Sequence, residues 1–322
     1  MRNNFFCLLL LGSLLLNACG TDAIKNKSEN TVLENQDSSK KSNLNPDSNQ
    51  TKSGVSDIKS KLIGYYVGDF KDAGLSGKTN KINISIDKLL GDSIYGHSVV
   101  AGNYRPWSGK ITFDNFGGFI VEAKEPGDNP YDGEFRFNYT EVHLDNNNGK
   151  GFGIKGSWKS FKPLKVSNRM YILSKVDFVY NPNQELFDSY SDENKKKAIR
   201  TTTTEYDDNN GKPVKGKVRV DTGYYMTSED LFEYNPSVQV LTREIVSNLK
   251  KADIFILRNS IYARHGYSFK NPQLRNYFDL QSWYIPVSAD VTKDLTKIEK
   301  DNIILLKKYE EHAKEYYDVF GR

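Results

Sequence analysis

Cysteine is almost absent from this chain: its 322 residues include only Cys7 and Cys19. The remainder of the sequence therefore has no thiols with which to build a disulfide framework or a thiolate metal site. A cysteine nucleophile is excluded there for the same reason.

Signals for metal binding are also lacking. Two Asp- and Asn-rich segments, 145–149 and 207–211, resemble calcium loops only in part, because their glycine falls one position early and no Glu follows at the end of the loop. Both are better explained as turns. The histidines lack the paired spacing of catalytic zinc sites; they are His97, His143, His265 and His312. We expect no metal.

Enzyme fingerprints are missing as well. No Gly-x-Ser-x-Gly elbow, phosphate loop or dinucleotide motif follows a suitable strand, so we expect no cofactor and consider an enzyme less favoured than a binding protein. Carboxylates in the segment 122–134 could pair as in a glycosidase, but a polar loop between two strands explains them more simply. They are Glu122, Glu125, Asp128, Asp132 and Glu134.

The formal net charge of +4 is small, and positive and negative side chains are interspersed. Such a surface gives no reason to expect a nucleic-acid partner.

The N-terminus has the pattern of a signal peptide. Arg2 precedes the apolar stretch Phe5–Leu16, which is too short for the ~20 residues that a membrane-spanning helix needs. The residues Leu16-Asn17-Ala18-Cys19-Gly20 resemble the lipobox of bacterial lipoproteins. The resemblance implies that residues 1–18 are removed and that Cys19 carries lipid; the alternative is an ordinary secretory signal with an incidental cysteine.

This resemblance also implies a location. We expect an exported protein that is anchored by lipid to the cell envelope, in the outer membrane if the host has two membranes, because Gly20 is not Asp. Residues 19–60 would form a tether, since they are rich in Asn, Ser and Lys and contain no aromatic residue. A flexible segment of this length spans roughly 35 Å.

The folded part is expected to be α+β with more than one domain. In residues 61–180, Ile82, Ile84 and Ile86 alternate with polar residues, as in a strand with one buried face. Eight such candidate strands with short turns predict an antiparallel meander that forms a small barrel or a sandwich, with the barrel favoured. Their ranges are 62–70, 82–86, 93–100, 110–113, 119–123, 134–139, 152–160 and 170–180.

Residues 181–240 are predicted to connect this domain to the next and to contain a hairpin. Its strands would be 201–206 and 214–226, on either side of Asp208-Asn209-Asn210-Gly211. Whether the hairpin joins the first sheet stays open.

Residues 241–322 show a helical period. Ile254, Leu257 and Ile261 lie on one helix face, and Gly266 can end that helix. Asn271 with Pro272 is typical of the start of a second helix, and Thr296 to Glu299 of the capping box of a third.

The run Tyr262-Ala263-Arg264-His265-Gly266, followed by Tyr277-Phe278 and Trp283-Tyr284, resembles the YARHG domain. The resemblance covers about the last quarter of the chain. It implies a bacterial extracellular or envelope module, often found on lipoproteins, and implies no activity.

The candidate site residues come from this region. Arg264 and His265 are expected in the last turn of a helix, where capping and packing are favoured over the alternative of His265 as a general base. Most aromatic residues here, including Tyr262, should form the core of so small a domain. A sharper hypothesis leaves Trp283 or Tyr284 exposed as a platform for a sugar ring or a protein.

Three functions stay open. The first is a non-enzymatic, membrane-anchored envelope protein that binds a cell-wall polymer or a protein partner. The second is a small-ligand carrier that uses the interior of the β domain. The third is a cell-wall hydrolase with His265 as its base.

Overall fold

The computed structural model describes residue 59 and residues 61–74, 77, 79–114, 118–144, 149–202, 205–214, 216 and 218–316. The expected signal peptide, the lipidation site Cys19 and nearly all of the expected tether lie outside this range. These three expectations therefore stay predictions.

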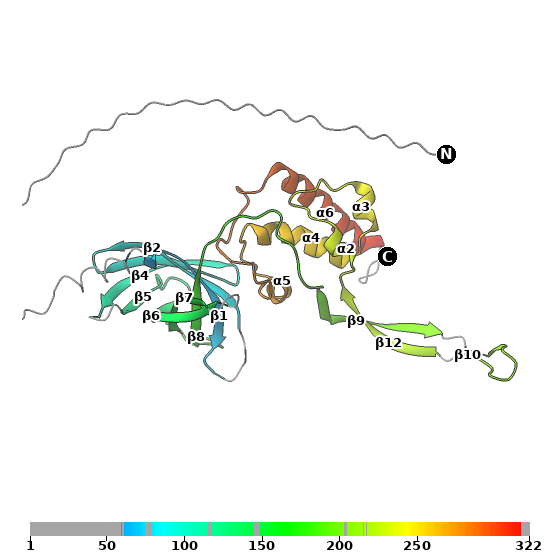
Figure 1. Ribbon diagram of the computed structural model, residues 1–322, viewed down its shortest axis with the longest axis horizontal. Helices are drawn as coiled ribbons and strands as arrows, with labels where there is room; N and C mark the ends of the chain where they lie inside the picture. The colour runs from blue at the N-terminus through cyan, green and yellow to red at the C-terminus, as the bar shows by residue number, and fades with distance from the viewer. Residues whose placement is uncertain are drawn as a thin grey trace, which may run out of the picture. The chain divides into compact units, whose positions relative to one another are not determined.

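The first folded element is a closed barrel of eight antiparallel strands, which confirms the predicted meander and its closure (Figure 1). Each strand pairs with the next along the chain, and β1 pairs with β8 to close the barrel. The strands are β1 Gly64–Asp72, β2 Lys81–Leu90, β3 Ser93–Val100, β4 Asn103–Phe113, β5 Phe119–Lys124, β6 Gly133–Leu144, β7 Gly149–Ser160 and β8 Asn168–Val176.

Alternation of side chains builds the interior of this barrel. In β5, Phe119, Val121 and Ala123 are buried while the residues between them are exposed. One end of the barrel is filled: Leu62 is fully buried just before β1, and the Tyr66 hydroxyl donates to its carbonyl oxygen over 2.6 Å. Large side chains of the middle strands, such as Phe137, continue this packing.

After the barrel come two small antiparallel sheets, one inside the other about the same turn, which is the connectivity of the predicted hairpin. β9 (Ser191–Thr202) pairs with β12 (Val218–Met226), and β10 (Glu205–Tyr206) pairs with β11 (Pro213–Val214). The turn that ends in Gly211 agrees with the prediction, since this glycine has a φ of 63°. The start of β9 was not predicted, because residues 191–200 are mostly charged and show no apolar alternation.

The C-terminal region contains the helices α2 (Asp230–Glu233), α3 (Arg243–Asn248), α4 (Lys251–Arg264), α5 (Pro272–Phe278) and α6 (Lys297–Tyr316). Among the described residues, no helix combines the length and the apolar character needed to cross a membrane.

The helix boundaries follow the predicted signals. α4 is followed by Gly266 at a φ of 73°, and the Asn271 side chain accepts from the N–H of Gln273 at the start of α5. At the start of α6, the Thr296 N–H donates to Glu299 over 2.9 Å and the Glu299 N–H donates back to the Thr296 hydroxyl. This is the predicted capping box.

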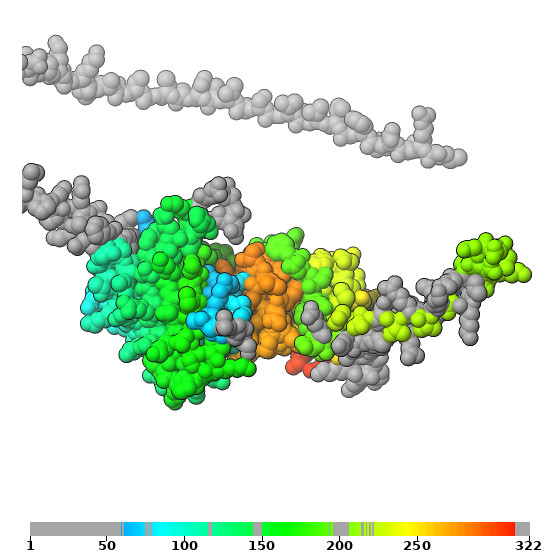
Figure 2. All heavy atoms as spheres, turned by 90° about the horizontal axis from the view of Figure 1, so that it is seen from below, coloured from blue at the N-terminus to red at the C-terminus, as the bar shows by residue number. Residues whose placement is uncertain are grey.

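Lys81, at the start of β2, links the barrel to the helical region. In Figure 2, orange atoms of the helical region lie against atoms of the barrel. Its N–H donates to Asp279, and its ammonium group donates to the carbonyl oxygens of Gln281 and Tyr284 over 2.9 and 3.1 Å. Burial lowers the pKa of Lys81, and the charge of Asp279 offsets part of that effect. The two regions are therefore joined by partly buried polar contacts.

Candidate functional site

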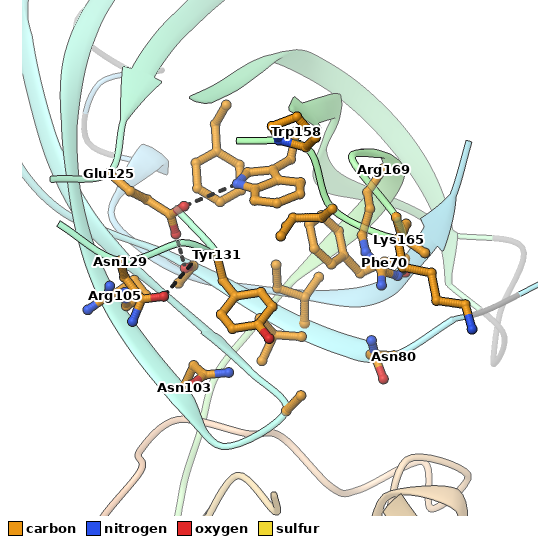
Figure 3. A pocket seen from close by; sticks show the side chains of 18 residues that line it. Phe70, Asn80, Asn103, Arg105, Glu125, Asn129, Tyr131, Trp158, Lys165 and Arg169 are labelled. Atoms are coloured by element: carbon orange, nitrogen blue, oxygen red, sulfur yellow. Dashed lines mark hydrogen bonds between the residues drawn. The ribbon is translucent and has the colours of Figure 1, made fainter. Parts of the chain in front are cut away.

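The barrel is hollowed at the end opposite Leu62. A cavity of about 580 Å³ lies where the loops β1–β2, β3–β4, β5–β6 and β7–β8 meet (Figure 3). This volume is within the usual range for small-molecule sites, about 300 to 1,000 Å³. The barrel is therefore filled by its own side chains at one end and open at the other.

Aromatic side chains form the inner wall of this pocket. Phe70 ends the buried row of β1, and Phe135 and Trp158 come from β6 and β7. The rings of Phe70 and Trp158 meet edge to face with centroids 5.8 Å apart. Polar side chains of the loops surround this apolar wall, among them Asn80, Asn103 and Asn129.

Glu125 places a carboxylate inside the pocket. Its Oε2 accepts the Gly133 N–H over 2.7 Å and the indole N–H of Trp158 over 3.1 Å, while its Oε1 accepts the Ser98 hydroxyl over 3.0 Å. The side chain is nearly buried, with 7 % of the residue exposed. Burial raises the pKa of Glu125 although these hydrogen bonds act in the opposite direction.

A second carboxylate shapes the β5–β6 loop. Asp132 is fully buried; its Oδ1 accepts from Arg105 over 2.8 Å and its Oδ2 accepts the N–H groups of Gly127 and Asn129. Arg105 also pairs with the exposed Asp128. Burial by itself would raise the pKa of Asp132, but these hydrogen bonds and the charge of Arg105 outweigh it and lower the pKa.

Arg169 brings a cation to the pocket from the start of β8. Its guanidinium donates to the Phe70 carbonyl oxygen over 2.8 Å and lies over the Phe70 ring, 5.0 Å from the centroid. Burial lowers the pKa of Arg169, and the charge of Asp72 offsets part of that change. Within the described part of the chain, no carboxylate lies at ion-pair distance from this guanidinium.

The sequence-predicted residue Arg264 serves as a packed, hydrogen-bonded cation at the end of α4. Its Nε donates to the Gln184 carbonyl oxygen over 2.9 Å, and one terminal nitrogen donates to the Ser260 hydroxyl over 2.8 Å. Only 4 % of the residue is exposed, and burial lowers its pKa to about 10. These bonds agree with the favoured role in capping and packing.

His265 lies in a closed network. Its Nε2 is 2.8 Å from Glu299, its ring stacks on Tyr180 at 4.1 Å, and the Tyr180 hydroxyl donates to Glu299 as well. Since a carboxylate only accepts, Nε2 carries the proton of the first bond. Nδ1 is then the nitrogen left to accept a proton, but the residue is buried, with 6 % exposed, and its ring is stacked on Tyr180. The position suits a structural role better than catalysis.

Tyr284 is buried, with 1 % of its surface exposed, as the favoured core role requires, so the alternative of an exposed platform does not hold for this residue. Its ring packs near Phe269 and Phe278, and its hydroxyl donates to the Tyr267 carbonyl oxygen over 2.7 Å. In a helical region this small, a large aromatic side chain is needed for the core.

The other two candidates lie apart from each other. Trp283 is half-buried and lines a groove of about 490 Å³ together with Arg264. Tyr262 lines a different groove, beside Arg258 and Asp290. The structure therefore does not combine the predicted C-terminal residues into one site.

A ligand site inside the β domain was one of the open alternatives, but sequence reasoning did not find the residues that line the pocket, although one signal for them was present. The carboxylates of 122–134 were assigned to a polar loop, but Glu122 and Glu134 are exposed residues of β5 and β6, and only Asp128 is an exposed carboxylate of the loop itself. However, the period-two alternation of Phe119, Val121 and Ala123 places Glu125 at the next inward position. An acidic residue at an inward position is an indication of a site. Trp158 and Arg169 carried no comparable signal.

No group of three or more metal-ligating side chains occurs in the part of the chain that the structure describes.

Comparison with known families finds one match: residues 235–311 match the YARHG domain. The C-terminal quarter of the chain is therefore a YARHG domain, as its motif indicated. Comparisons with curated proteins and with solved structures found no match. The barrel and its pocket lie outside the matched residues.

Proposed function

We propose that this protein is a non-enzymatic binding protein of the bacterial cell envelope, held at the membrane by lipid on Cys19, and that the barrel pocket is its binding site. The observation that carries the proposal is the cavity of about 580 Å³ with an aromatic wall and a nearly buried carboxylate. Concave, mostly apolar sites with a few placed polar groups are typical of small-ligand recognition.

This proposal favours the small ligand over a polymer held on exposed aromatic residues. A polymer platform needs aromatic faces at the surface, whereas Tyr284 is buried and Trp283 is half-buried. Hydrolysis through His265 is disfavoured because the residue is buried, with 6 % exposed, and its ring is stacked on Tyr180. The tether predicted for residues 19–60 would carry the pocket away from the lipid surface.

Ligand-observed NMR tests the pocket. A panel of small molecules is screened against the chain without its predicted signal peptide and against two variants. Val166→Trp narrows the pocket, since Val166 lines it. Val218→Trp is the control, because Val218 is an exposed residue of β12. We expect molecules that bind the parent chain and the control but lose binding to the Val166 variant. The absence of any such molecule would contradict the proposal.

The membrane anchor is tested separately. The full chain is expressed in a bacterium, and its membrane fraction is analysed by mass spectrometry. We expect an N-terminal Cys19 with added acyl mass, and a Cys19→Ser variant that leaves the membrane fraction. An unmodified Cys19 in a membrane-free protein would exclude the anchor.

A further inference from the structure

We infer that the barrel pocket takes a small zwitterionic ligand with an apolar body, such as a short peptide with free ends. Its ammonium group would meet Glu125 and its carboxylate would meet Arg169. The inference rests on the proposed function, because it requires that the pocket is the ligand site.

Glu125 has one oxygen available to a ligand. Its Oε2 already accepts two N–H groups, from Gly133 and Trp158, whereas Oε1 accepts only the Ser98 hydroxyl. A carboxylate has about four lone-pair sites, so Oε1 retains acceptor capacity. The oxygen that Ser98 contacts is therefore the one that a ligand's N–H groups would reach.

The charge of Glu125 is not balanced by a cation of the pocket. Arg105, the cation of the neighbouring strand β4, forms its ion pairs with Asp132 and Asp128 instead. No ion pair of Glu125 occurs among the described residues. A nearly buried carboxylate without a counter-ion is costly, and an ammonium group brought by a ligand would relieve that cost in a medium of low dielectric.

Arg169 offers the opposite charge on the other side of the pocket. Figure 3 shows Glu125 and Arg169 on facing walls, with the ring of Trp158 between them at the back of the pocket. Among the described residues, the guanidinium donates one hydrogen bond, to the Phe70 carbonyl oxygen. Since arginine has five N–H donors, several are left for a ligand carboxylate. Lys165, which is exposed on the same side, adds positive charge.

The space between the two charges is apolar. It is lined by Phe70, Phe135, Trp158 and Leu164, which suits an aliphatic or aromatic body rather than a polyol. A purely cationic ligand would leave Arg169 unused, and a purely anionic one would face Glu125. A molecule with an ammonium group at one end and a carboxylate at the other can pair with both Glu125 and Arg169.

The test uses dialanine, dileucine and diphenylalanine with free ends, together with their N-acetylated and their C-amidated forms. Binding to the chain without its predicted signal peptide is measured by calorimetry. We expect at least one free dipeptide to bind, and either cap to weaken binding by at least about tenfold, because each cap removes one charged partner.

Variants that remove one charge of the pocket test which residue contacts each charged end of the dipeptide. In Glu125→Gln, the free and the acetylated dipeptides should bind alike, while amidation should still weaken binding. In Arg169→Met, the free and the amidated dipeptides should bind alike, while acetylation should still weaken binding. The matched controls are Glu122→Gln and Arg136→Met, since these residues form an exposed pair on the outer face of the barrel, with side chains 68 % exposed. Both controls should keep the parent pattern.

The outcomes separate the two proposals. If neutral molecules from the NMR screen bind in the pocket but no free dipeptide does, the zwitterion inference is overturned and the proposed function stands. If capped and free dipeptides bind equally, the inference is likewise overturned. If nothing binds in the pocket, both fail. A charge variant that fails to bind the neutral molecules is judged misfolded. The inference is then decided by the other charge variant: Glu125→Gln with the acetylated dipeptides, or Arg169→Met with the amidated ones.

Discussion

Replacing Glu299 by Gln removes the charge at the centre of the YARHG domain while keeping the shape of the side chain. Glu299 accepts hydrogen bonds from His265 over 2.8 Å, from the Thr296 N–H over 2.9 Å and from the Tyr180 hydroxyl over 2.9 Å. It is fully buried. These bonds therefore join the end of α4, the start of α6 and the segment that leaves the barrel.

The magnitude follows from the pKa of this carboxyl group. Burial by itself would raise the pKa of Glu299, but the hydrogen bonds outweigh it and lower the pKa to about 2 from the ordinary 4.5. At ~1.4 kcal/mol per pKa unit, this difference corresponds to on the order of 3 kcal/mol of stability. Loss of one partner of a buried pair costs a similar amount.

The sign of the pH dependence follows from the same change. A carboxyl group with a lowered pKa in the folded state stabilises the fold above its unfolded pKa, and this stabilisation disappears as the pH falls from about 4.5 to about 2. The parent chain should lose this contribution over that window. Glu299→Gln should not, because it has no proton to gain.

Urea unfolding of the C-terminal helices, followed by circular dichroism at pH 7 and near pH 2, measures both effects. The control is Asp301→Asn on the same helix, since Asp301 pairs with Lys297 at the surface and the two side chains are 58 % and 87 % exposed. The control should cost less than about 0.5 kcal/mol. A Glu299→Gln loss as small as that of the control, or a loss that is equal at both pH values, would refute the reasoning.

Two further predictions concern packing and loop attachment. Gly96→Ala should destabilise the barrel by about 2 kcal/mol or more, because its Cβ would lie 2.0 Å from the Ser85 carbonyl oxygen and 2.3 Å from the Trp107 ring; a thermal melt of Gly96→Ala that matches the parent would contradict this contact. Asn302→Ala should lower the free energy of unfolding by about 2 to 4 kcal/mol. The Asn302 side chain accepts the Leu241 N–H and donates to the Pro236 and Gln239 carbonyl oxygens, so the variant loses the attachment of the segment before α3 to α6. Hydrogen exchange at Leu241 that stays as slow as in the parent would argue against this prediction.

Local signals predicted much of the fold. The isoleucines of β2 alternate as the barrel requires, and the glycine after α4, the Asn271 cap and the Thr296 capping box lie where the helices begin or end. Such signals act over two to four residues, so they can be read from a short stretch of sequence. The YARHG motif was equally local.

Long-range contacts limited the prediction. The start of strand β9 was not predicted because its charged residues are held by pairing with β12 instead of by an apolar face. Tyr284 and Trp283 were equivalent in sequence, yet the first fills the core and the second lines a groove. Burial of one of two adjacent aromatic residues depends on neighbours from other helices.

The sequence by itself determined the eight-stranded meander and the helical region after it, because periodicity is a property of neighbouring residues. It also determined the end of α4, the starts of α5 and α6, and the family of the C-terminal quarter, because capping and the family motif are equally local. Only the tertiary structure decided where the barrel is open and what lines the opening. Glu125 and Trp158 are 33 positions apart, and Arg105 and Asp132 are 27 apart, so closure of the barrel is what makes them partners. The pocket exists because strands that are distant in sequence bring their ends together.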